Sequence, residues 1–330
     1  MNTISYSQEI KRAVKEAYEI KHRRAIDEAA DRKKELYAKV PGLLEIDAEL
    51  SKTGLKIYHE AINKHAEASL DERIEILRKE NEDLLVKRAE LLAMHGYEKD
   101  YTSPRFECEK CSDTGYVGID PCECVHLALK KEAYLHSGLG LMLSEQTFDN
   151  FDLDLYPESE RREMTNVYNG AVRFAENYNA SSMPEDKNLL FFGGTGLGKT
   201  HLTTAIGRRL IDRGFYVIYD SATNIISTFE KHRFSRDNDT DKYFECDILM
   251  LDDLGAETFG AFNRMSVYDI INTRLNLNKG TVISTNFCSI PDMKKAYDER
   301  IVSRIAGTYR MFRFTGDDIR IVKKKKMQRK

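Results

Sequence analysis

The stretch NLLFFGGTGLGKTHL (residues 188–202) contains the features that decide the fold. Leu189 to Phe192 form an apolar run with the length and composition of a buried strand. The turn that follows matches the spacing G-x-x-x-x-G-K-[ST] from Gly193 to Thr200, and apolar residues then recur at helical spacing. A strand, a glycine-rich turn and a helix in this order predict a phosphate-binding loop in a parallel α/β sheet.

Each residue type in this loop has a chemical reason to be there. Glycines let backbone N–H groups point at phosphate oxygens, and the next helix offers its N-terminus to the anion. Lys199 can reach the β- and γ-phosphates, and the Thr200 hydroxyl can ligate Mg²⁺. The sequence therefore predicts binding of ATP with Mg²⁺, against the alternative of a glycine-rich turn without a ligand. The predicted nucleotide-binding residues are Gly193, Gly194, Thr195, Gly196, Leu197, Gly198, Lys199, Thr200 and His201.

Two further apolar runs end in polar side chains. ILML (residues 248–251) is followed by Asp252 and Asp253, and VIST (residues 282–285) is followed by Asn286. Open α/β sheets bind ligands at the carboxyl ends of their strands. We expect Asp252 to join Thr200 in holding Mg²⁺ and Asp253 to polarise the attacking water. Asn286 can orient that water or the γ-phosphate, although asparagine after a strand is also a common turn former.

Length and charge limit the possibilities. The chain has 330 residues, enough for two domains, and a formal net charge of −3. Any DNA contact must therefore be a local patch. The sequence lacks a run of about 18 apolar residues and an apolar signal segment, so we expect no membrane partner and a cytoplasmic protein.

Residues 1–100 are expected to be helical and to bind a partner, with breaks at Pro41-Gly42 and near Ser69. From Leu70 the apolar residues follow a 4-3 spacing in which Asn81 and Arg88 fill the polar positions. This seam predicts a coiled coil or a helical hairpin, with an amphipathic helix in a small bundle as the alternative.

Four thiols crowd into residues 101–136, a loop-built module followed by a connecting helix. They are Cys108, Cys111, Cys122 and Cys124. Two close pairs of cysteines predict structural Zn²⁺ in a Cys₄ site. Because the second pair is C-x-C, His126 could replace Cys122 or Cys124. An iron–sulfur cluster and free thiols are the alternatives.

Strands and helices alternate through residues 137–322, which predicts an α/β domain with a parallel sheet. A single helix is expected from Asp292 to Ile305. The basic tail, residues 323–330, is either a solvated tail or a contact to phosphate backbones. The other expected elements are helices at 125–136, 158–178, 199–212 and 264–278, and strands at 215–219, 247–251, 281–284 and 309–314.

Taken together, these motifs resemble the AAA+ ATPases, and within them the bacterial replicative-helicase loaders of the DnaC/DnaI type, which are related to IstB-like ATP-binding proteins. The stretches that carry the resemblance are GGTGLGKTHL (193–202), DILMLDDLGAE (247–257), VISTNF (282–287) and DERIVSRIAGTYRMFRF (298–314). The resemblance implies a P-loop sheet without a C-terminal lid, preceded by the helical region and the zinc module. It also implies slow hydrolysis outside an assembly.

The resemblance also implies roles for single residues. Asn286 matches the sensor 1 position. Arg304 matches the arginine finger, which acts on ATP held by a neighbouring subunit and so implies self-association; Arg300 is a second candidate. Residues 221–232 match a helix that contacts single-stranded DNA, where Lys231 and Arg233 would suit that contact; a plain surface helix is the alternative.

We therefore expect an ATP-dependent loader of the replicative DNA helicase onto single-stranded DNA. ATP binding and hydrolysis would switch its engagement with both partners. The alternative is an IstB-like transposition helper that acts on a transposase and target DNA. A nucleotide-binding adaptor with negligible turnover is a third possibility.

Overall fold

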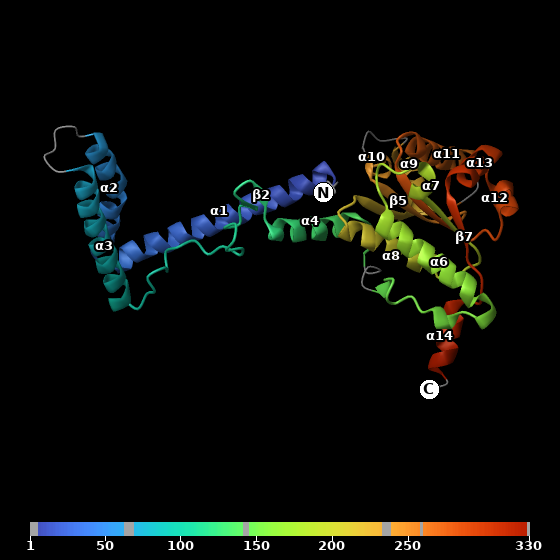
Figure 1. Cartoon of the computed structure of the whole chain (residues 1–330), viewed down its shortest axis with the longest axis horizontal. Coiled ribbons are helices and arrows are strands. Elements are labelled where there is room, and N and C mark those ends of the chain that lie inside the picture. The colour runs from blue at the N-terminus through green and yellow to red at the C-terminus, as the bar shows by residue number, and fades with distance from the viewer. Residues whose placement is uncertain (1–5, 63–68, 141–144, 233–238, 258–259, 329–330) are drawn as a thin grey trace. The chain divides into compact units, whose positions relative to one another are not determined.

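The computed structural model describes residues 6–62, 69–140, 145–232, 239–257 and 260–328. The chain divides into two compact units, and Figure 1 traces the elements of each. One unit is Lys15–Cys124. The other joins the segment before Lys15 to Val125–Lys330, and we call it the P-loop unit after the motif it contains.

Helices form most of the first unit. They are α1 (Gln8–Lys39, which begins in the P-loop unit), α2 (Leu43–Ile62) and α3 (Leu70–Met94). Both predicted breaks are confirmed. Gly42 adopts a φ of +85° between α1 and α2, and Ser69 caps α3 by accepting a hydrogen bond from the backbone of Glu72.

The predicted seam is a helical hairpin of α2 against α3, which lie side by side in Figure 1. Its polar positions pair across the two helices. Thr53 Oγ1 donates to Asn81 Oδ1 over 3.1 Å, and Arg88 Nε donates to Asp47 Oδ1 over 2.7 Å. Leu92 closes the hairpin in a small apolar cluster with Leu36, Val40 and Leu43. These paired polar groups fix the register of the two helices.

A five-stranded sheet forms the centre of the P-loop unit, in the order β4-β5-β6-β3-β7. Every neighbouring pair is parallel, which confirms the predicted fold class. The strands are β3 (Asn188–Phe192), β4 (Val217–Ser221), β5 (Ile248–Leu254), β6 (Gly280–Thr285) and β7 (Arg310–Arg313). Because β3, β5 and β6 run side by side in the same direction, the glycine loop, the acid pair and Asn286 all lie at the carboxyl ends of these strands.

Helices cover both faces of this sheet. In Figure 1, α6 and α8 lie together on one face, and α9, α11 and α13 lie on the other. The helices of the unit are α4 (Glu123–His136), α6 (Glu158–Asn177), α7 (Pro184–Lys187), α8 (Lys199–Asp212), α9 (Ala222–His232), α10 (Asp241–Glu245), α11 (Ala261–Asn276), α12 (Ile290–Ala296), α13 (Glu299–Thr308) and α14 (Ile319–Met327). A 3₁₀ turn spans Leu153–Leu155.

The prediction of one helix from Asp292 to Ile305 is wrong. Tyr297 is extended between α12 and α13, and Asp298 starts the second helix. The Asp298 carboxylate accepts hydrogen bonds from the backbone N–H groups of Arg300 and Ile301, at 3.0 and 3.1 Å. Asp298 is therefore the N-terminal cap of a second helix, at a position where the sequence predicts one continuous helix.

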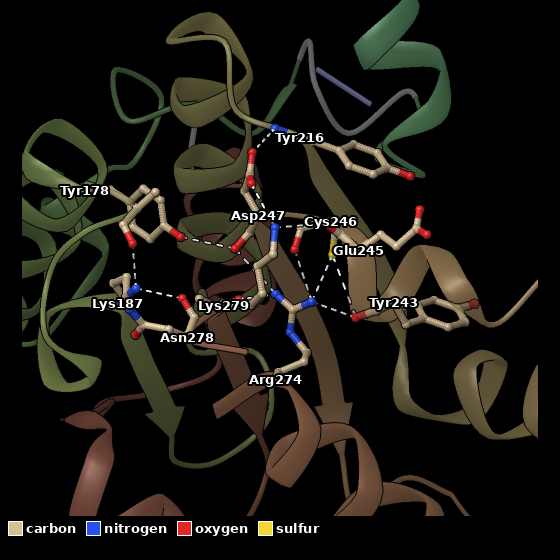
Figure 2. Close-up of polar contacts among 12 residues, drawn as sticks. Tyr178, Lys187, Tyr216, Tyr243, Glu245, Cys246, Asp247, Arg274, Asn278 and Lys279 are labelled. Carbon is tan, nitrogen blue, oxygen red and sulfur yellow. Dashed lines mark hydrogen bonds and ion pairs between the residues drawn. The ribbon is translucent and has the colours of Figure 1, made fainter. Parts of the chain in front are cut away.

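At the amino ends of the strands, the buried side chain of Arg274 ties several strand starts together (Figure 2). Its guanidinium donates to the carbonyl groups of Tyr243, Cys246 and Gly280. The Asp247 carboxylate belongs to the same network and accepts a hydrogen bond from the backbone N–H of Tyr216 over 3.0 Å. This network fixes the strands at the edge opposite the predicted site, so their carboxyl ends are held in register.

No helix in the described part of the chain is long and apolar enough to cross a membrane.

Replacing Asp47 with alanine should destabilise the hairpin by about 2–3 kcal/mol, because it leaves the half-buried guanidinium of Arg88 and hydroxyl of Tyr37 without their buried acceptor. The Asp47 side chain is only 6% exposed and also pairs with Lys33 over 3.3 Å. Glu49→Ala, which removes an exposed acid from the same helix, should cost less than about 1 kcal/mol. Denaturant titration with hydrogen exchange in α2 and α3 measures both. Equal effects of the two substitutions would contradict the prediction.

Candidate functional site

The glycine loop lies between β3 and α8, as predicted. Gly193 has a φ of +138°, and Gly198 caps α8 with a φ of +90°. A Cβ at Gly193 would lie 2.4 Å from the carbonyl oxygen of Phe314. The loop therefore needs glycine both for its backbone conformation and for its close approach to the chain after β7.

Lys199 is buried inside the loop. Its Nζ donates to the carbonyl oxygens of Gly193 and Gly194, at 2.8 and 2.5 Å, and to Asn286 Oδ1 at 2.8 Å. Burial lowers the pKa of Lys199, and the nearby carboxylates of Asp253 and Asp252 oppose that shift. The ammonium group is thus held beside the two acids at the position where the motif needs a cation for phosphate oxygens.

Asp252 is held by hydroxyl groups from three elements. Thr200 Oγ1 donates over 3.1 Å, Tyr219 OH donates over 2.7 Å, and the Ser284 hydroxyl donates from β6. A carboxylate and a threonine hydroxyl in contact are hard oxygen ligands of the kind that Mg²⁺ prefers. Asp252 and Thr200 fit the predicted metal site, where the ion would neutralise phosphate charge.

The ladder between β5 and β6 is irregular at the acid pair. Leu251 pairs with Ile283, but the next pair is Leu254 with Thr285. Asp253 lies in the extra length with a φ of +53°. A bulge of this kind re-aims a side chain at the end of a strand, and the strained backbone marks a functional position.

Asn286 connects the lysine of the loop to the second acid. Its Oδ1 accepts from Lys199, and its Nδ2 donates to Asp253 Oδ1 over 3.2 Å. Burial and the charge of Asp252 raise the pKa of Asp253, while Lys199 and Asn286 pull it down. A carboxylate with a raised pKa beside the cation suits a group that accepts a proton from water.

These residues surround a pocket of about 500 Å³. The predicted residues that line it are Thr195, Gly196, Leu197, Gly198, Lys199, Thr200, His201, Asp253 and Asn286. His201 contacts the Thr147 carbonyl oxygen at 2.7 Å and packs edge-on against Phe151, which also lines the pocket. Nine of the predicted site residues therefore line one cavity, whereas Gly193, Gly194 and Asp252 are not among its lining residues.

Helix α14 brings residues to this pocket that the sequence analysis missed. The backbone N–H of Ile319 donates to the Gly196 carbonyl oxygen over 2.9 Å, and Arg320 and Lys323 line the cavity. A Cβ at Gly196 would lie 2.2 Å from the Asp318 carboxyl group, so glycine permits this docking. Arg320 lies in a basic stretch with no motif, and only its tertiary position reveals it.

Some predicted residues lie elsewhere. Arg304 is on α13, where its guanidinium stacks over the Tyr268 ring at 5.5 Å; it is not among the residues that line the pocket. Lys231 is exposed at the end of α9. Arg233 and the last two residues of the basic tail lie outside the described residues. Residues 323–327 continue α14.

The four predicted zinc ligands meet in the other unit. The Sγ atoms of Cys108, Cys111, Cys122 and Cys124 all lie within 4.8 Å of one another, so a tetrahedral site needs no histidine. Asp113 shapes the first pair by accepting from the backbone of Glu107 and Cys108, at 2.8 and 2.9 Å. The second pair follows the short hairpin of β1 (Tyr116–Val117) and β2 (Asp120–Pro121).

The pKa values of the clustered thiols shift in opposite directions. A backbone hydrogen bond from Cys111 and neighbouring thiols lower the pKa of Cys108 to about 7, whereas burial raises the pKa of Cys124 to about 12. Four thiolates in this space require a positive charge among them, and Zn²⁺ supplies it in sites of this composition. On α1, the His22 ring donates to the Ser112 carbonyl oxygen over 2.7 Å, which attaches the module to that helix.

Comparison with known proteins identifies the domain around the pocket. The family model of the IstB-like ATP binding protein matches residues 142–308, about half of the chain. The chain is 34% identical over 121 residues to the chromosomal replication initiator protein DnaA of Campylobacter jejuni, covering 36% of this chain and 27% of that protein. It thus spans about a quarter of the length of that relative.

A second relative is the replicative helicase loader DnaC of Buchnera aphidicola. It is 24% identical over 184 residues, which is 54% of this chain and 70% of the loader. A crystal structure of the DnaC helicase loader covers 53% of this chain and 100% of its own, with 22% identity and a TM-score of 0.47. The sequence matches confirm the recognition of an AAA+ ATP-binding domain of this group from its motifs.

Replacing Arg320 with glutamine should weaken ATP binding about three- to tenfold. A hydrogen bond to a charged group contributes about 1.5–3 kcal/mol, and we expect less than that, about 0.7–1.4 kcal/mol, because Arg320 is exposed and solvent weakens its interaction with phosphate. Lys324→Gln, on the same helix but not lining the pocket, is the matched control. Fluorescent-nucleotide titration measures both, and an equal loss in the two variants would mean that only the charge of the helix matters.

The purified chain should contain about one zinc ion, and Cys111→Ser should lose it. Cys288→Ser, at an exposed cysteine outside the cluster, should keep the metal. Elemental analysis measures the zinc, and hydrogen exchange across residues 106–124 reports the accompanying loss of local order. Zinc retained in full by Cys111→Ser would contradict the Cys₄ assignment.

Proposed function

Because the chain belongs to the family of IstB-like ATP-binding proteins, we propose that it is an ATPase that loads the replicative DNA helicase onto single-stranded DNA. One observation carries the hydrolytic part of the proposal. Asn286 accepts a hydrogen bond from Lys199 and donates one to Asp253, so these three side chains are connected in sequence beside the glycine loop. A protein that used ATP only as a conformational ligand would not require a positioned acid beside the lysine.

The residues divide the work of hydrolysis between them. Backbone N–H groups of the loop and Lys199 bind the phosphates, and Thr200 with Asp252 would hold Mg²⁺, which neutralises phosphate charge. Asp253 accepts the proton of the attacking water, and Asn286 orients that water. Arg304 of a neighbouring subunit completes the site. The position of Arg304 on α13, outside the pocket of its own chain, supports this division between subunits.

The loader assignment is supported by the match to the relative named replicative helicase loader DnaC, which extends over most of that protein. The proposed partners are the helicase and single-stranded DNA, and the proposed partner-binding part is residues 1–100 with the cysteine module. In this arrangement ATP binding favours the engaged state, and hydrolysis releases it.

A second function has its own supporting observation, since the matching family model is described as IstB-like. A transposition helper would use the same P-loop unit on a transposase and target DNA. The helical unit and its cysteine cluster favour the loader. Association with one partner class rather than the other separates the two functions.

We expect the ATP turnover of the purified protein to be slow and to rise when its host's replicative helicase and single-stranded DNA are added. Lys199→Ala should abolish ATP binding. Arg304→Ala should keep ATP binding but lose about a hundredfold or more of the stimulated turnover, because the finger acts only in the transition state.

Steady-state turnover and nucleotide titration measure these effects, with Arg300→Ala as the comparison on the same helix. Absence of helicase association and of stimulation would refute the loader and favour the transposition helper. ATP binding without turnover under any condition would refute the hydrolytic role.

A further inference from the structure

A buried pair of side chains lies between the acid pair and the helix that carries Arg304. Glu257 is in the loop that leaves β5, and Tyr297 is in the extended turn between α12 and α13. The two residues are only 4% and 3% exposed. Neither has a role in the phosphate or metal site described above.

The pair fixes the loop after β5. Tyr297 OH donates to Glu257 Oε1, and Glu257 Oε2 accepts from the backbone N–H of Gly255 over 2.8 Å. Gly255 follows Asp253 by two residues, so both oxygens of the carboxylate are engaged next to the acid pair. Such a buried carboxylate is strongly held, because losing a donor leaves an acceptor without a partner in a water-poor site.

The pair also contacts the segment after β6. The ring of Phe287, which directly follows Asn286, packs edge-on against Tyr297 with the centroids 6.1 Å apart. A Cβ at Gly255 would lie 2.6 Å from the Phe287 ring. The Phe287 carbonyl oxygen accepts from the backbone of Gly193 over 3.0 Å. The glycine loop and Asn286 are therefore connected to this pair through Phe287, and the acid pair is connected to it through Gly255.

On its other side, Tyr297 leads directly into α13. Asp298 caps that helix, and the buried residues Ile301, Val302 and Ile305 fix its rotation. Arg304 then projects beside Tyr268, whose hydroxyl accepts from its Nη2 over 3.3 Å. The direction of the guanidinium is thus set by where α13 begins, and the buried Tyr297 immediately precedes the residue that caps this helix.

We propose that Glu257 and Tyr297 are positioning residues that attach the finger helix α13 to the ATP site of its own chain and so aim Arg304 at the ATP of the neighbouring chain. This inference rests on the proposed trans-acting finger. Its chemistry is the shared hydrogen bond between a buried carboxylate and a phenol, together with the Phe287 ring contact. Changes around Asp253 and Asn286 reach the finger helix through this contact.

The test uses mixtures of two full-length chains. The Arg304→Ala chain supplies an intact ATP site without a finger, and we call it the site donor. The Lys199→Ala chain supplies an intact finger without an ATP site, and we call it the finger donor. Neither chain should turn over ATP alone, whereas the mixture should, under the conditions that give wild-type turnover. Absence of turnover in this starting mixture would overturn both the trans finger and the present inference.

Tyr297→Phe is then placed in one donor at a time. It keeps the ring and removes the hydroxyl. We expect a loss of about tenfold or more when it is in the finger donor and less than twofold when it is in the site donor. The ATP affinity of the site donor should be unchanged. A loss that follows the site donor, or equal losses in both, would overturn the inference because the pair would then support nucleotide binding.

Two further variants control for folding. Tyr178→Phe removes a buried hydroxyl that donates to the Asp247 carbonyl oxygen at the opposite edge of the sheet, and it should affect neither donor. Glu257→Gln keeps an oxygen acceptor and should retain most of the mixed turnover, whereas Glu257→Leu should match Tyr297→Phe. Full turnover with Glu257→Leu in the finger donor would overturn the inference.

Discussion

The hydroxyl of Ser284 is the contact on which the ATP-binding edge of the sheet depends. It donates to Asp252 and accepts from the backbone N–H of Asp253, so one side chain of β6 replaces the ladder bonds that β5 loses at its bulge. Because of the bulge, the consecutive acids Asp252 and Asp253 can serve different roles in the same site. In a regular strand they would point to opposite faces of the sheet, and only one would reach the loop. The strained φ of Asp253 is sustained because Ser284 and Asn286 hold both its backbone and its side chain.

Sequence reasoning succeeded where the signal is local. The strand, loop and helix within residues 188–212 are predicted correctly, because the glycine spacing and the apolar runs that define them involve residues close together in the sequence. The two breaks in the N-terminal helices follow from Pro41-Gly42 and a capping serine for the same reason. The four cysteines also come together as their spacing predicts.

The contacts that the sequence did not reveal join residues far apart in the chain. Arg320 reaches the pocket because Gly196 admits Asp318, and Tyr219 reaches Asp252 because β4 lies beside β5. Neither arginine nor tyrosine belongs to a recognisable pattern at those positions. The start of α13 was missed for another reason, since the apolar periodicity continues through Asp298 although the backbone does not. In each case tertiary packing selects among options that local propensity leaves open.

Helix α1 has a consequence for anyone who divides this chain into fragments. Ile10 in its first turn, and Tyr6 just ahead of the helix, belong to the apolar core of the P-loop unit, while Leu36 near its other end belongs to the apolar cluster of the hairpin. A recombinant fragment that starts at Val125 would expose the surface that these first residues cover, at about 1.5–3 kcal/mol for each large side chain lost. A fragment whose boundaries follow the sequence motifs would therefore be less stable and more prone to aggregate. Adding a peptide of the first fourteen residues would cover the exposed apolar surface again.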